Sequence, residues 1–205
     1  MDHTIDTIIF DLGGVLVDWN PRYLYRKVFD REEDMEMFLT EICSPAWNAE
    51  QDGGRTFAEA SQILIEQYPN FETEIKMYFD RWPEMFSDNI EGSIDILKTL
   101  VNDDKYKVYA LTNWSAETWP TALELFPFFH WFDDVLVSGA ENMKKPDAEI
   151  YELILDRFNI DRTKAVFFDD SLKNVTGAQA VGLHAFQFLS PEQLKDDLKK
   201  YGVTV

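Results

Sequence analysis

The sequence predicts an α/β fold, a doubly wound parallel sheet that carries an inserted and mainly helical cap. Two observations predict it. Short apolar strands alternate with helical periods over residues 90–205, which is typical of a parallel sheet covered by helices. A single strand at 7–10 precedes a long stretch, 20–86, with helical spacing and no strand pattern. We therefore expect a core at 1–17 and 90–205 and a cap at 18–89.

The core strands are expected from short apolar runs. The first, Thr7–Phe10, is apolar or β-branched throughout, as in strands that are buried on both faces. Four more strands are expected at 107–111, 134–137, 165–168 and 183–188, with helices between them. A last helix should begin after Ser190, because Ser is a strong N-cap and Pro191 suits the first turn.

The insert is predicted to be helical. Met35, Phe38 and Ile42 repeat at helical spacing, and Asp30 with Glu33 is expected to form a capping box before them. Because the insert leaves the chain directly after the first strand, it should lie over the carboxyl ends of the strands, where open α/β folds bind ligands. Hinges at 17–20 and 89–92 should let the cap close.

Charge and composition restrict the partners. The net charge is −19, from 38 acidic and 19 basic residues, and such a surface repels nucleic acid and anionic membranes. The single cysteine, Cys43, excludes an internal disulfide and fits a reducing compartment. Neither a leader pattern nor an apolar run of membrane-spanning length is found. We expect a cytoplasmic protein, monomeric or weakly self-associating.

Polar residues follow four of the expected strands. They are Asp11, Thr112 with Asn113, Lys144 with Lys145, and Asp169 with Asp170. In a parallel sheet these positions converge on one crevice. Each alone could be a turn or helix-capping residue, but three carboxylates, a hydroxyl and an ammonium together make a site for a hard cation and a phosphate. Adjacent carboxylates repel each other unless a cation lies between them, and oxygen ligands with an incomplete protein shell suit Mg²⁺.

Four segments, in this order, resemble the four motifs of the haloacid dehalogenase superfamily. They are residues 8–16, residues 111–113, residues 145–147 with Ile150 and Tyr151, and residues 167–170 with Asn174, Gly177 and Ala178. The resemblance covers essentially the whole chain. It is greatest to the branch of small-molecule sugar phosphatases, of the α-D-glucose-1-phosphate phosphatase kind.

The resemblance implies a role for each matching residue. Asp11 would be the nucleophile that forms an aspartyl-phosphate intermediate. Asp11 and Asp170 would bind Mg²⁺, with Asp169 bound directly or through water. Thr112 and the backbone amide of Asn113 would hold phosphoryl oxygens. Lys145 would neutralise charge between the nucleophile and the phosphate, while Lys144 is expected to be a solvated neighbour.

One position departs from the family pattern. Two residues after the nucleophile, phosphatases of the family usually carry an Asp that supplies a carbonyl to the metal and a carboxyl group for acid/base catalysis. This chain has Gly13 there. Glycine keeps the metal-binding carbonyl and loses the acid, which is typically worth 10² to 10⁴-fold in rate.

The function that follows is a magnesium-dependent phosphatase acting on a small phosphorylated metabolite, similar to a sugar phosphate. The candidates for substrate contact are Trp47, Asp52, Arg55 and Trp114. Two alternatives stay open. A metal-independent haloacid dehalogenase would also use an Asp nucleophile without the second Asp, and a catalytically silent module of the same fold would need no acid.

Overall fold

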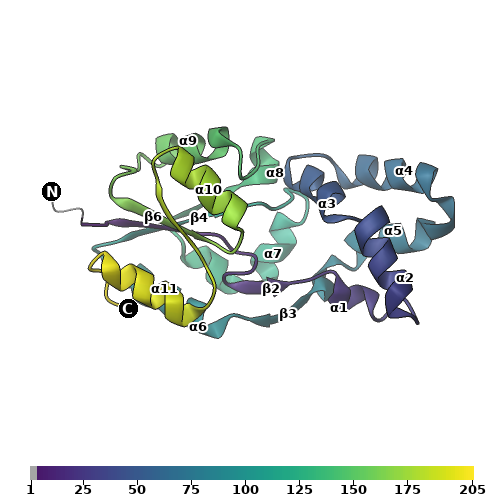
Figure 1. The fold of residues 1–205 in the computed structure, drawn as a ribbon, viewed down its shortest axis with the longest axis horizontal. Helices are drawn as coiled ribbons and strands as arrows, with labels where there is room; N and C mark the ends of the chain where they lie inside the picture. The colour runs from purple at the N-terminus through teal and green to yellow at the C-terminus, as the bar shows by residue number, and fades with distance from the viewer. Residues whose placement is uncertain (1–3) are drawn as a thin grey trace.

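The computed structural model describes residues 4–205, and its centre is a five-stranded parallel sheet (Figure 1). The strand order is β5-β4-β1-β6-β7. The strands are β1 (Thr7–Phe10), β4 (Lys107–Thr112), β5 (Asp134–Val137), β6 (Ala165–Asp169) and β7 (His184–Gln187). The expected doubly wound α/β fold is confirmed, with strand bounds within one residue of those predicted.

Helices cover both faces of this sheet. Ile8 and Phe10 of β1 pack in one cluster with leucines of α6 (Glu91–Val101) and α11 (Pro191–Lys200). Ile9 faces the other way, into a second cluster with α9 (Ala148–Arg157) and α10 (Leu172–Ala180). All four residues of β1 are buried, because a strand between two helical layers has no solvent face.

The shorter elements of the core lie between these strands and helices. They are α7 (Trp119–Leu125), a 3₁₀ helix at Pro127–Trp131 and α8 (Ser138–Glu141). The helix after Ser190 begins as predicted, since the Ser190 hydroxyl accepts a hydrogen bond from the backbone amide of Gln193.

The insert after β1 is mainly helical and lies beside the core at the right of Figure 1. Its α-helices are α1 (Arg22–Tyr25), α2 (Glu32–Met37), α3 (Pro45–Asp52), α4 (Phe57–Gln67) and α5 (Glu72–Asp80). A π-helix at Phe38–Ile42 and 3₁₀ helices at Pro69–Phe71 and Trp82–Met85 complete it.

Two features of the insert differ from the prediction. Strands β2 (Val17–Trp19) and β3 (Phe86–Asn89) form a two-stranded antiparallel sheet; β2 lies within the first expected hinge, 17–20, and β3 ends at the start of the second, 89–92. The capping box predicted at Asp30 is wrong, because α2 begins at Glu32 after an extended Arg31 with no side-chain cap. A capping box forms instead at α4, between Thr56 and Glu59.

No helix of residues 4–205 is long and apolar enough to cross a bilayer.

Candidate active site

The carboxyl ends of three neighbouring strands bring the predicted site residues together. Strand β1 lies between β4 and β6, so Asp11, Thr112 and Asp169 are adjacent at one edge of the sheet. The backbone amide of Asp11 donates to the Phe168 carbonyl over 2.8 Å and extends the β1–β6 pairing to Asp11. Asp11 is 7% exposed, and Thr112 and Asp169 are fully buried.

The side chain of Lys145 lies at the centre of this edge. Its Nζ lies 2.9 Å from Asp11 Oδ2 and 2.7 Å from Asp169 Oδ2, and it donates to the Leu111 carbonyl over 2.8 Å. The lysine is 1% exposed. A buried ammonium requires such partners, and the two carboxylates raise the pKa of Lys145 although burial opposes this. The lysine is therefore held as a cation.

Asn113 fixes the loop that carries this lysine. Its side-chain amide donates to the Lys145 carbonyl over 3.0 Å, and its Oδ1 accepts from the Lys145 amide over 2.8 Å. The loop also approaches α10 closely. A Cβ at Gly177 would lie 2.5 Å from the Pro146 carbonyl oxygen, so only glycine fits there. The Asn113 side chain thus positions Lys145, while its backbone amide stays at the end of β4.

Three carboxyl groups gather beside the lysine. Ligand oxygens of Asp11, Asp169 and Asp170 all lie within 4.8 Å of one another. Burial raises the pKa of Asp11 well above its ordinary value despite the Lys145 ammonium, and burial and Asp169 raise the pKa of Asp170. One ammonium cannot neutralise three carboxylates at this distance, so the cluster fits a divalent cation with oxygen ligands.

The carboxylate of Asp169 is also held by neighbours other than Lys145. Asp169 Oδ1 accepts from the Ser171 amide over 2.8 Å and from Asn174 Nδ2 over 3.0 Å. The Oδ1 of Asn174 is buried and has no partner among residues 4–205. It is available to accept from a metal-bound water. Gly14, at φ 72°, lets the chain pass Asp170, because a Cβ there would lie 2.5 Å from Asp170 Oδ2.

Gly13 faces open space. A Cβ placed on it would meet no heavy atom within 4 Å, and the residue lines the pocket described next. The volume that an acidic side chain would occupy is therefore present and unfilled by protein.

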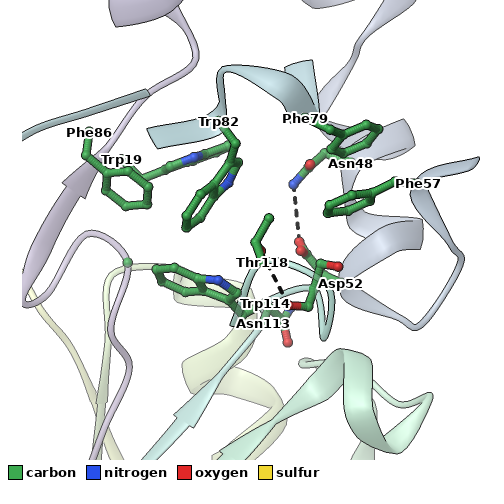
Figure 2. A pocket seen from close by; sticks show the side chains of 12 residues that line it. Trp19, Asn48, Asp52, Phe57, Phe79, Trp82, Phe86, Asn113, Trp114 and Thr118 are labelled. Carbon is green, nitrogen blue, oxygen red and sulfur yellow. Dashed lines mark hydrogen bonds between the residues drawn. The ribbon is translucent and has the colours of Figure 1, made fainter. Parts of the chain in front are cut away.

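The pocket lies between the core and the insert (Figure 2). It is lined by Gly13, Trp19, Asn48, Asp52, Phe57, Phe79, Trp82, Phe86, Asn113, Trp114, Ser115 and Thr118. Half of these 12 residues are aromatic. Burial raises the pKa of Asp52 to about 7; its carboxylate accepts from Asn48 over 3.3 Å.

The four substrate-contact candidates divide into two pairs. Asp52 and Trp114 line the pocket. Trp47 and Arg55 do not: the Trp47 indole donates to the Ala60 carbonyl over 3.3 Å, and Arg55 donates to Gln51 and to the Trp47 carbonyl. These two side chains hold the insert together.

Sequence reasoning missed most of the aromatic wall. Phe79 and Trp82 repeat at helical spacing, a pattern that by itself indicates a helix and not a pocket. Their place in the sequence could have identified part of this wall. Trp19, Trp82 and Phe86 lie close to the two points where the insert joins the core.

Contacts tie the insert to the core beside the pocket. The Ser138 hydroxyl donates to the Asp52 carbonyl over 2.5 Å, and the Phe57 amide donates to Glu117 over 2.7 Å. Lys144, expected to be solvated, pairs with Glu50 of α3 at 2.7 Å. The insert is therefore docked over the site.

This fold and this edge of carboxylates and lysine define a hydrolase of the haloacid dehalogenase type. Residues 5–182 match the family described as haloacid dehalogenase-like hydrolase, and the chain belongs to this family.

Curated relatives and solved structures agree with that assignment. A sesquiterpene phosphatase of Aspergillus oryzae is 29% identical over 88% of both chains. A phosphorylated carbohydrates phosphatase of Thermotoga maritima is 26% identical over 87% of this chain and 82% of its own. The fold matches a HAD family enzyme of Bacteroides thetaiotaomicron, solved as a magnesium complex, with a TM-score of 0.71 at 23% identity, covering 91% of this chain and 94% of that one.

Proposed function

We propose that this hydrolase is a magnesium-dependent phosphatase that cleaves a small phosphate monoester through a phosphoenzyme on Asp11. The observation that carries the proposal is the arrangement of Asp11, Asp169 and Asp170 around the buried Lys145 ammonium. Two relatives named as phosphatases support it. Mg²⁺ bound by the three aspartates and the Gly13 carbonyl would supply charge neutralisation for the phosphoryl oxygens.

The proposed reaction has two steps, and Asp11 is the nucleophile of the first. In the first step a carboxylate oxygen of Asp11 forms a bond to phosphorus, and the bond from phosphorus to the ester oxygen breaks. The leaving alkoxide takes a proton from water and departs as an alcohol. Water then attacks the phosphorus of the acyl phosphate, which releases inorganic phosphate and restores Asp11.

Lys145 and the end of β4 have the supporting roles. The Lys145 ammonium already touches Asp11 and would contact an oxygen of the transferred group, where it offsets developing negative charge. Thr112 and the Asn113 amide, at the end of β4, are proposed to hold the other phosphoryl oxygens. Lys145 needs no change of position for its role, because Asn113 fixes the loop that carries it.

We further propose that the insert, 18–89, is a cap and that 1–17 and 90–205 form the catalytic core. The pocket is lined from both parts, so a substrate must enter when the cap separates from the core. The β2–β3 pair, which joins the two, would be the hinge. A phosphate analogue should then lower the rate of protease cleavage at 17–20 and 89–92, and equal rates would contradict this.

The metal-independent dehalogenase is a weaker alternative. A solved dehalogenase shares the fold, with a TM-score of 0.66 at 18% identity, which shows the fold alone. A carboxylate pair after β6 has no use without a cation, because its members repel each other.

Release of inorganic phosphate with magnesium and with chelator tests the proposal. Wild type should release phosphate from p-nitrophenyl phosphate only with magnesium, and Asp11→Asn should abolish release. Asp156→Asn removes the same charge from an exposed position on α9 and serves as the control. Release that survives in Asp11→Asn, or that ignores the chelator, would refute the mechanism. No release by wild type would favour the silent module.

A further inference from the structure

Two groups of aromatic side chains form the walls of the pocket. Trp82, Phe86 and Trp114 contact one another with ring centroids 4.8 to 5.9 Å apart. Phe57 and Phe79 stack at 3.7 Å. Figure 2 shows the first group and Trp19 on one side of the pocket and the Phe57–Phe79 stack on the other. The rings hold one another in place, so the walls are formed before any ligand arrives.

The floor of the pocket is polar and belongs to the reaction site. Gly13 and Asn113 line it; Asn113 directly follows β4, and Gly13 lies two residues after Asp11. The phosphate of a substrate therefore lies at this end, and the carbon body that it carries must extend between the two aromatic groups.

The polar side chains of the walls already have partners within the protein. From the core come Ser115, whose hydroxyl accepts from the Glu117 amide over 3.2 Å, and Thr118, whose hydroxyl donates to the Ser115 carbonyl over 3.4 Å. Asn48 and Asp52 are the polar side chains that the cap contributes to the pocket within the described residues, and they hydrogen-bond to each other. The aromatic wall adds indole donors: the Nε1 atoms of Trp19 and Trp114 are buried without a partner among residues 4–205. A sugar carries several hydroxyl donors, and each one left unpaired in an apolar pocket weakens binding on the order of tenfold.

A hydrocarbon body has the opposite preference. It buries apolar surface against the rings and brings no hydroxyl group that must find a partner, and aromatic walls that are already in place lose little freedom when they bind it. Resting on the phosphatase function proposed above, we infer that the substrate is the phosphate monoester of a hydrocarbon alcohol, of the prenyl or alkyl kind, rather than a sugar phosphate. This replaces the sugar-like substrate that the sequence suggested.

Binding to the Asp11→Asn protein tests this inference apart from turnover. Isothermal titration with magnesium should give geranyl phosphate a Kd at least tenfold below that of glucose 1-phosphate. Equal or tighter binding of glucose 1-phosphate would overturn the inference, and so would failure of both to bind. If geranyl phosphate binds as expected but wild type hydrolyses neither it nor p-nitrophenyl phosphate, the proposed phosphatase function fails while the pocket assignment stands.

A matched pair of variants tests the wall itself. Phe57→Ala removes a partly exposed ring of the wall, and Phe71→Ala removes a partly exposed ring of the insert that packs on Phe38 away from the pocket. In the same Asp11→Asn background, Phe57→Ala should weaken geranyl phosphate binding about tenfold and leave glucose 1-phosphate binding unchanged. Phe71→Ala should change neither. Equal losses for the two variants, or for the two ligands, would refute the inference.

Discussion

Gly13→Asp should restore an acid that this chain lacks. A Cβ at Gly13 meets no heavy atom within 4 Å, and its φ is not positive, so an aspartate fits without strain. Replacing this glycine also reduces the conformational freedom of the unfolded chain, which stabilises the folded protein by about 0.4–1 kcal/mol. We therefore expect the variant to fold and to present a carboxyl group to the pocket.

The effect on rate should depend on the leaving group. General acid catalysis is worth about 10² to 10⁴-fold, and we expect the lower end, about 2.7 kcal/mol, because no neighbouring side chain orients the new carboxyl group. An alkyl phosphate leaves as a basic alkoxide and should gain the full factor. p-Nitrophenyl phosphate leaves as a stable phenolate and needs no proton, so its rate should change by less than about threefold.

The assay compares kcat/KM for an alkyl phosphate and p-nitrophenyl phosphate at saturating magnesium. Gly13→Asn, which has nearly the same size without a titratable proton, is the control and should show no gain on either substrate. A variant that hydrolyses p-nitrophenyl phosphate normally but gains nothing on the alkyl phosphate would refute the reasoning. An equal gain for Asp and Asn would refute it too.

Three further predictions concern the charges around the pocket. Lys145→Met leaves Asp11 and Asp169 buried without their ammonium. Thermal unfolding without metal should therefore show that the free energy of unfolding falls by about 3–5 kcal/mol, and phosphate release should fall at least about 10²-fold. An unchanged unfolding curve would contradict the ion pairs. Burial raises the pKa of Asp52 from 3.8 to about 7, so the folded protein keeps a proton that the unfolded chain has released. Its contribution to stability should then fall as the pH rises from about 4 to 7, by no more than about 4 kcal/mol, and Asp52→Asn should flatten this part of the profile. Asp170→Asn should reduce the rise in melting temperature that magnesium gives, because metal at about 100 times its Kd stabilises by about 2.7 kcal/mol and the variant loses one ligand; an equal rise would remove Asp170 from the metal site.

The core and the cluster of carboxylates with Lys145 could be predicted because their signals are local. The three central strands carry apolar runs, and Asp11, Thr112 and Asp169 follow these runs directly. Once the strands are parallel, their carboxyl ends must share an edge. The sequence therefore predicted the neighbours in space without a view of any side chain.

The substrate end could not be predicted in the same way. Phe79 and Trp82 have the spacing of buried helical residues, and periodicity does not distinguish a core from the wall of a cavity. Strand β3 was missed because it is short and mostly exposed, and an isolated strand pair lacks the apolar run that reveals a core strand. Arg55 was expected in the pocket for its charge, but its guanidinium pairs with Gln51 and the Trp47 carbonyl.

Three of the six tryptophans of the chain, Trp19, Trp82 and Trp114, line one cavity. Their emission therefore reports directly on what occupies that cavity and on how the two parts that form it are arranged. Displacement of water by a ligand should shift the emission to shorter wavelength, and separation of cap from core should shift it to longer wavelength. The protein thus carries an optical probe of its own, which allows occupancy and closure to be followed in real time without a label.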